Sequence, residues 1–114
     1  MPIAADILEA LRLELRRGTL ILAVLGTLRT EKYGYTLKTE LGALGIEIDE
    51  GALYPMLRRL ETQGLLTSEW REEAKRQKRF YRLSADGAAA LDQLATTWRA
   101  MNGALSDILE GRGT

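Results

Sequence analysis

The hydrophobic pattern of the chain changes its period twice, and this change limits the folds that are open to it. Up to about residue 64 the apolar residues recur at spacings of 3 and 4, which is typical of amphipathic helices. Over residues 65–83 they alternate with polar residues, as in β-strands, and after Ser84 the helical spacing returns. A chain of 114 residues suffices for one domain. The pattern therefore predicts a mostly α fold with a small β hairpin.

Two helical segments are expected at the N-terminus. Residues 4–16 are amphipathic, with charged side chains between the apolar ones. The run from Arg16 to Thr19 then offers a helix stop followed by a new N-cap, so a separate second helix is predicted over residues 20–28. The wide apolar stripe of this second helix is typical of a helix buried in a core.

Two further helices are expected before the hairpin. The third follows a turn and ends at Gly45, and the fourth runs from about Asp49, as its N-cap, to Gln63. Pro55 lies within the fourth helix. If this helix starts at Asp49, the proline removes one backbone hydrogen bond; if it starts nearer Gly51, the proline falls in the first turn, where the loss matters less.

Two strands are predicted over about residues 65–71 and 78–83, each with side chains that alternate between two faces. The connecting residues 72–77 are mostly charged and lack the Asn-Gly or Asp-Gly pair of a tight turn. We therefore expect a longer, mobile connection with a solvated tip.

A long helix is predicted after the hairpin, from Ala85 to about Leu109, with Ser84 as its N-cap. Its apolar residues follow intervals of 3, 4, 3, 4 and 3, the pattern of a helix seam. One small domain does not cover both this stripe and that of the N-terminal helix. Pairing of two copies across a two-fold axis would bury them, and so would antiparallel pairing of the two helices within one chain. The residues expected at the dimer contact are Leu8, Leu11, Leu91, Leu94, Trp98, Met101, Leu105 and Ile108.

The composition excludes most catalytic chemistry. The chain contains neither cysteine nor histidine, so thiolate nucleophiles, imidazole bases and the usual zinc and haem ligands are missing. The glycines at positions 42 and 45 are better interpreted as helix-end residues than as a phosphate-binding loop. We therefore expect no enzyme, no metal and no cofactor. Acidic residues near the N-terminus and the lack of a long apolar run predict a cytoplasmic protein that crosses no membrane.

The net charge of zero hides an uneven distribution. Residues 50–82 carry a net charge of +3, while the parts before and after them carry −1 and −2. Residues 75–82 include five basic side chains and no acidic one, beside two aromatic residues. A charge run is usually only a solvated face. At a hairpin that follows a candidate recognition helix, however, the run predicts a clamp for DNA phosphates.

Helices followed by a hairpin form a winged helix-turn-helix, in which the second helix of the turn enters the major groove and the hairpin is the wing. On this recognition helix, Arg58 or Arg59 would bind a guanine or a phosphate, or would pair with acidic neighbours on a solvated face. Tyr54 would donate to a phosphate, and Ala52 or Pro55 would touch a thymine methyl group. The residues predicted to contact DNA are Tyr35, Lys38, Ala52, Tyr54, Pro55, Arg58, Lys75, Arg76, Lys78 and Arg79.

Three sequence blocks, at residues 33–35, 50–66 and 78–87, resemble the PadR-like transcriptional regulators in type, order and spacing. The resemblance covers about residues 16–110. It implies a dimeric winged-helix repressor of the short type, in which one C-terminal helix pairs with the other subunit. The sequence departs from the family at Ala52, where many relatives have Thr or Ser, and at the wing tip, which is often rich in glycine in relatives.

Trp98 lies in the middle of the helix seam, where it is either a packing residue or a stacking surface for a ligand. In short PadR-like proteins flat aromatic effectors can bind in a pore between the subunits, and the resemblance implies such a site here. Ala95, Arg99 and Asn102 are further candidates for its wall.

These features predict residues 1–85 as a winged helix-turn-helix DNA-binding domain, whose N-terminal helix packs with the dimerisation region. Residues 86–110 would form the C-terminal dimerisation helix and residues 111–114 a frayed tail. The expected function is a homodimeric regulator, a repressor, that binds an inverted repeat in double-stranded DNA and responds to a small planar aromatic molecule. The alternative is a winged-helix module that binds a partner protein; the zero net charge favours it and the basic run disfavours it.

Overall fold

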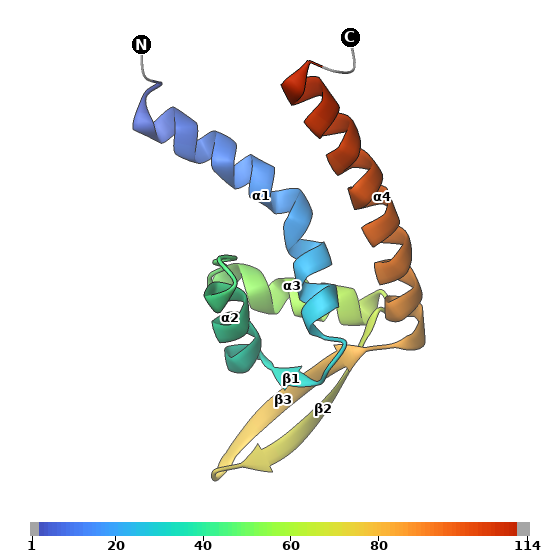
Figure 1. Ribbon diagram of the computed structural model, residues 1–114. Helices are drawn as coiled ribbons and strands as arrows, with labels where there is room; N and C mark the ends of the chain where they lie inside the picture. The colour runs from blue at the N-terminus through green and yellow to red at the C-terminus, as the bar shows by residue number, and fades with distance from the viewer. Residues whose placement is uncertain (1–2, 112–114) are drawn as a thin grey trace.

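The computed structural model describes residues 3–111 as four helices and a three-stranded antiparallel sheet (Figure 1). This architecture confirms the predicted fold class, mostly α with a small hairpin, and the long final helix. In chain order the elements are α1 (Ala5–Thr27), β1 (Lys32–Tyr33), α2 (Gly34–Ala43), α3 (Glu50–Thr62), β2 (Leu66–Glu73), β3 (Arg76–Leu83) and α4 (Ala85–Glu110). The strands lie in the order β1-β3-β2 in the sheet.

Helix α1 is continuous, so the predicted break at residues 16–19 is wrong. Gly18 and Thr19 lie inside it, and the Thr19 hydroxyl donates to the Arg16 carbonyl at 2.8 Å. A single glycine costs a helix interior only about 1 kcal/mol. The burial of Val24 and Leu25 one to two turns later outweighs this cost, since each fully buried side chain of that size contributes about 1.5–3 kcal/mol.

The hydrophobic core lies between the second half of α1, α2, α3 and the sheet. Leu25, Leu37, Leu53 and Leu57 have no exposed surface. Leu91 joins this core from the second turn of α4, which still faces the domain. Its prediction as a dimer contact is therefore wrong, because the side chain is already covered by its own chain.

The helix caps agree with the sequence. Asp49 Oδ1 accepts a hydrogen bond from the backbone N–H of Ala52 at 2.8 Å, and the Ser84 hydroxyl accepts from the N–H of Gly87 at 2.9 Å. Because α3 begins directly after Asp49, Pro55 lies beyond its first turn. The proline therefore does remove one backbone bond from the helix.

The wing is a tight hairpin, so the predicted mobile loop over residues 72–77 is wrong. Only Ala74 and Lys75 connect β2 to β3, and both have positive φ angles, 51° and 65°. Two-residue hairpins favour positive φ because it matches the twist of the flanking strands. Eight consecutive residue pairs, from Leu66 with Leu83 to Glu73 with Arg76, impose this conformation on two non-glycine residues.

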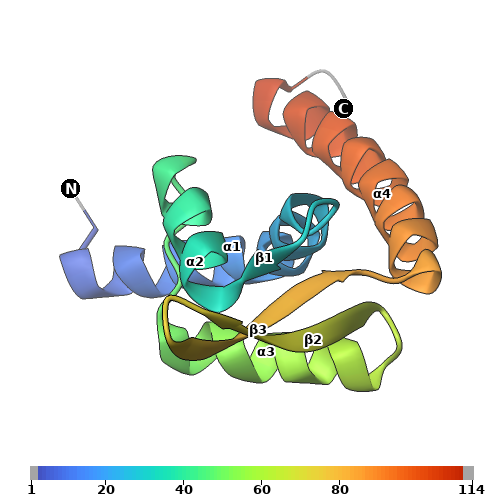
Figure 2. The same ribbon diagram turned by 90° about the horizontal axis from the view of Figure 1, so that it is seen from below.

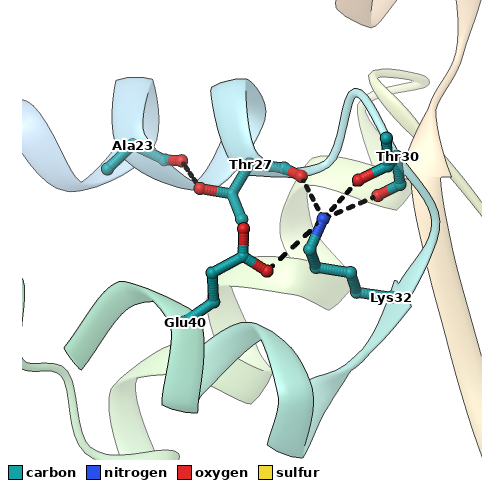
Figure 3. Close-up of polar contacts among 5 residues, drawn as sticks. All are labelled: Ala23, Thr27, Thr30, Lys32 and Glu40. Carbon is teal, nitrogen blue, oxygen red and sulfur yellow. Dashed lines mark hydrogen bonds and ion pairs between the residues drawn. The ribbon is translucent and has the colours of Figure 1, made fainter. Parts of the chain in front are cut away.

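The two-residue strand β1 was not predicted, because two residues carry no periodic signal. It pairs Lys32 with Tyr81 and Tyr33 with Phe80. The Lys32 ammonium donates to the carbonyl oxygen of Thr27 at 2.9 Å and to the hydroxyl of Thr30, and lies 3.6 Å from Glu40 (Figure 3). Only 11% of this side chain is exposed. Lys32 thus links the end of α1 to α2. Its positive charge also stabilises the C-terminal end of α1, where the helix dipole is negative.

The first half of α1 and the last half of α4 extend away from this core and diverge toward the two chain ends (Figures 1 and 2). The helices form an open V, so pairing within the chain covers their apolar stripes only in part. Many apolar side chains remain exposed there, namely Ile7, Leu11, Leu15, Leu94, Trp98, Met101, Leu105 and Ile108.

None of the helices in residues 3–111 combines the length and apolar character of a membrane-spanning segment. Of the predicted frayed tail, Gly111 ends α4 with a φ of 76°, and residues 112–114 lie outside the described part.

Candidate nucleic-acid interface and interhelical groove

A cleft of about 360 Å³ opens between the start of α2, the outer face of α3 and the wing. We call it the wing cleft. It brings together five of the ten side chains predicted to contact DNA. Its lining consists of these five, Tyr35, Tyr54, Arg58, Lys78 and Arg79, with Tyr33, Gly34, Trp70, Gln77 and Tyr81.

The Tyr54 ring packs against the first residue of α2, and only glycine leaves room for it. A Cβ atom on Gly34 would lie 2.2 Å from Cε1 of the ring. Burial, and to a lesser extent the charge of Glu50, raises the pKa of Tyr54. The phenol is therefore neutral at ordinary pH and remains a hydrogen-bond donor at the cleft.

Two of the basic residues at the cleft already have acidic partners. Lys78 Nζ lies 3.2 Å from a carboxylate oxygen of Glu73 and 4.4 Å from the centre of the Tyr33 ring. The hydrogen bond to Glu73 raises the pKa of Lys78. Arg79 Nη2 lies 2.7 Å from Glu61 Oε1. The predicted phosphate clamp therefore contains pairs of opposite charge as well as exposed cations.

Exposed predicted contact residues are found both in the cleft lining and outside it. Arg58 lines it and is exposed, whereas Arg59 is exposed outside the lining. Lys38 Nζ on α2 lies 3.7 Å from Glu50. The remaining predicted residues are all exposed, Ala52 and Pro55 on α3 and Lys75 and Arg76 at the wing turn.

Sequence reasoning missed five residues of the lining, Tyr33, Gly34, Trp70, Gln77 and Tyr81. Trp70 and Arg79 share a face of the hairpin because the register pairs them, and alternation within each strand does not give that register. The Arg79 guanidinium carbon lies 5.6 Å from the Trp70 ring centre. Gln77 escaped notice because it was assigned to the loop that the structure shows as strand.

The face of the sheet opposite Trp70 and Arg79 carries a second cluster, which shares Tyr33 with the lining of the wing cleft. Arg71 lies 4.5 Å above the Phe80 ring, and Tyr33 contacts the same ring edge-on with centres 5.4 Å apart. Arg71 pairs with Glu31 and Glu69, and the hydrogen bond to Glu31 is the main cause that raises its pKa. This cluster attaches the wing to β1 and the segment before it.

A second space, of about 440 Å³, lies between α1 and α4. We call it the interhelical groove. Two of the four predicted effector-binding residues, Trp98 and Asn102, line it, whereas Ala95 and Arg99 do not belong to the lining. The lining side chains include no charged group: Leu15, Gly18, Thr19, Ile21, Leu22, Leu94, Thr97, Trp98, Met101, Asn102 and Leu105.

A family model described as the transcriptional regulator PadR-like family matches residues 21–93, more than half of the chain. The chain belongs to the PadR-like family of transcriptional regulators. The resemblance inferred from the three sequence blocks is thereby confirmed.

Known PadR-like structures share the whole fold. A PadR family transcriptional regulator from Eggerthella lenta DSM 2243 is 41% identical, with a TM-score of 0.87 over 92% of this chain and 94% of that chain. A PadR-like transcription factor from Bacteroides fragilis is 27% identical, with a TM-score of 0.73 over 87% and 98% of the two chains.

Among curated proteins, the transcriptional regulator Rv3488 of Mycobacterium tuberculosis is 44% identical over 63 residues. The match covers 55% of this chain and 59% of that protein. The PadR-like chain thus spans less than two thirds of the length of this curated relative.

Proposed function

We propose that this PadR-like chain is a homodimeric repressor that works in the cytoplasm and binds an inverted repeat in double-stranded DNA. The wing cleft carries the proposal. It gathers tyrosine side chains and basic groups where a recognition helix and a wing meet, and its basic residues all come from residues 50–82, which carry a net charge of +3. Hydroxyl, guanidinium and ammonium groups are the usual ligands of DNA phosphates.

The exposed face of α3 supplies the groups for base contacts. Ala52, Pro55 and Arg58 follow each other at spacings of three residues and are exposed. Arginine binds guanine edges in the major groove, and small apolar groups contact thymine methyl groups. A two-fold axis between two copies would present this face twice, which calls for half-sites about 10 bp apart.

The test is footprinting on the promoter of the chain's own gene, followed by titrations of the protected duplex at several salt concentrations. We expect Arg58→Ala to weaken binding to the protected duplex by about 1–3 kcal/mol and to relax the preference over random DNA. Arg59→Ala removes the same charge from the same helix outside the cleft and serves as the matched control. Equal losses in both variants would contradict the role of the cleft. Wild-type protein without preference over random DNA would contradict a specific regulator and favour the protein-binding alternative.

We also propose that the interhelical groove is completed by a second copy and admits a small planar aromatic effector without net charge. Trp98 is 43% exposed there, and the lining contains apolar side chains with only hydroxyl and amide groups among them. Such a wall favours neutral rings that stack on the indole. In a Trp70→Phe background, neutral planar compounds should quench Trp98 fluorescence. If a broad panel leaves the fluorescence unchanged, Trp98 is a packing residue.

A further inference from the structure

A triangle of hydrogen-bonded side chains joins the recognition helix to both strands of the wing. Glu61 lies at the end of α3, Ser68 on β2 and Arg79 on β3. Arg79 Nη2 donates to Glu61 Oε1 at 2.7 Å, Arg79 Nε donates to the Ser68 hydroxyl at 2.9 Å, and that hydroxyl donates to Glu61 Oε2 at 2.6 Å. Each member is therefore bonded to the other two. We call this the Glu61 triangle.

The surroundings restrict the Arg79 side chain further. Its guanidinium carbon lies 5.6 Å from the Trp70 ring centre and 5.4 Å from that of Tyr81. The Arg79 and Glu61 side chains are only 32% and 26% exposed. A guanidinium group has its donors in a rigid planar fork, so two bonds to different partners determine its orientation. Arg79 is thus directed toward α3.

This orientation decides whether Arg79, a member of the basic run over residues 75–82, is available to bind a DNA phosphate. For Arg79 to bind a phosphate, it would have to leave a charged partner at 2.7 Å and a hydroxyl at 2.9 Å. Held in place, the same side chain sets the wing against the helix. A winged-helix protein contacts DNA with both elements at once, so their relative position decides whether both sets of contacts form.

We propose that Arg79 contributes to DNA recognition as a positioning residue: through Glu61 and Ser68 it fixes the wing against α3, and it does not bind a phosphate. The inference rests on the proposed DNA-binding function. If it holds, Arg79 does not belong to the phosphate clamp that the run of basic residues predicted.

The direction in which Glu61→Ala changes DNA binding distinguishes a phosphate-binding Arg79 from a positioning Arg79. Loss of the carboxylate releases Arg79, so a phosphate-binding Arg79 would tighten binding to every duplex. A positioning Arg79 predicts the opposite: the ratio of affinities for the footprinted duplex and a scrambled duplex falls by roughly tenfold. Glu69→Ala is the matched control, because Glu69 lies on the other face of β2 and pairs with Arg71. This control should leave the ratio unchanged.

A double-mutant cycle tests whether Arg79 acts through the triangle. If it does, Glu61→Ala adds nothing to Arg79→Ala, and the double variant discriminates the two duplexes as well as the Arg79 variant. Multiplied losses would overturn the proposal. Ser68→Ala changes no charge and should reduce the ratio by a smaller factor, which keeps the test valid if the Glu61 variant folds poorly. A purely structural role would lower the melting temperature without changing the ratio in the folded protein.

The failures of the two proposals are distinguishable. Wild-type protein that binds both duplexes equally overturns the DNA-binding function. Selective wild-type protein, together with a Glu61→Ala variant that is equally or more selective, overturns the positioning role alone.

Discussion

The winged-helix half of the molecule buries most of its leucines within the chain, whereas the open V of α1 and α4 leaves most of its leucines exposed. The contrast runs along a single helix: Leu25 in the second half of α1 has no exposed surface, whereas Leu11 in the first half is 52% exposed. Both residues lie on apolar stripes of the same kind. Helical periodicity therefore identifies a face that needs cover but does not say whether this chain or another supplies it.

The largest expected effect on stability is in the winged-helix half. Leu25→Ala should lower the free energy of unfolding by about 2–5 kcal/mol, because it leaves a cavity in a packed core. Leu13→Ala, at an exposed site on the same helix, should change it by less than about 0.5 kcal/mol. Urea unfolding at one fixed protein concentration measures both. Similar losses would break the contrast between the halves.

Two glycines of α4 sharpen the comparison. A methyl group at Gly87 would lie 1.9 Å from the backbone carbonyl oxygen of Leu65, which cannot rotate away, so Gly87→Ala should destabilise the protein by about 1–3 kcal/mol. At Gly103 the methyl group would meet no described atom within 4 Å beyond the neighbouring residues and the backbone of its own helix. Gly103→Ala should therefore stabilise the helix by up to about 1 kcal/mol. Thermal unfolding should show shifts of opposite sign, and shifts of the same sign would refute this reading of α4.

In the open V of α1 and α4 the expected effect is on self-association. Leu105→Glu places a carboxylate in the interhelical groove, where a covering second copy would have to desolvate it. We expect at least about tenfold weaker self-association by analytical ultracentrifugation, with an unchanged circular dichroism spectrum. Leu109→Glu, at an exposed position outside the groove lining, is the control. Association that survives Leu105→Glu would show that the groove does not lie between copies.

The smallest expected effect concerns the junction of α1 with α2. Lys32→Met keeps much of the apolar stem but removes the ammonium group that bonds to Thr27 and faces Glu40. The unfolding free energy should fall by about 1 kcal/mol. Lys38→Met removes a more exposed ammonium group from α2 and should have less than half this effect in the same urea assay. Equal effects would mean that Lys32 is not a special link between the two helices.

The elements with a strong local signal were predictable. The caps at Asp49 and Ser84 and the ends of α3 follow from residue type and spacing. Weak or competing local signals failed. Gly18 and Thr19 resemble a helix boundary, but burial further along α1 overrides them.

The wing turn shows the same limit from the other side. Ala74 and Lys75 carry no signal for a tight turn, yet they form one because the paired residues of the two strands hold them in it. Half of the residues predicted to contact DNA do meet at the wing cleft. The pairing of Arg79 with Glu61, 18 positions away, was beyond the sequence pattern.

The sequence by itself determined the class of the fold, the order of its elements and membership of the PadR-like family, because periodicity, caps and motif blocks are local properties of the chain. Only the tertiary structure decided which cations face solvent and which are paired inside the molecule. It also decided which leucines this chain covers and which it leaves exposed. Both depend on distances between segments far apart in the chain, and charge counts and hydrophobic spacing do not contain those distances.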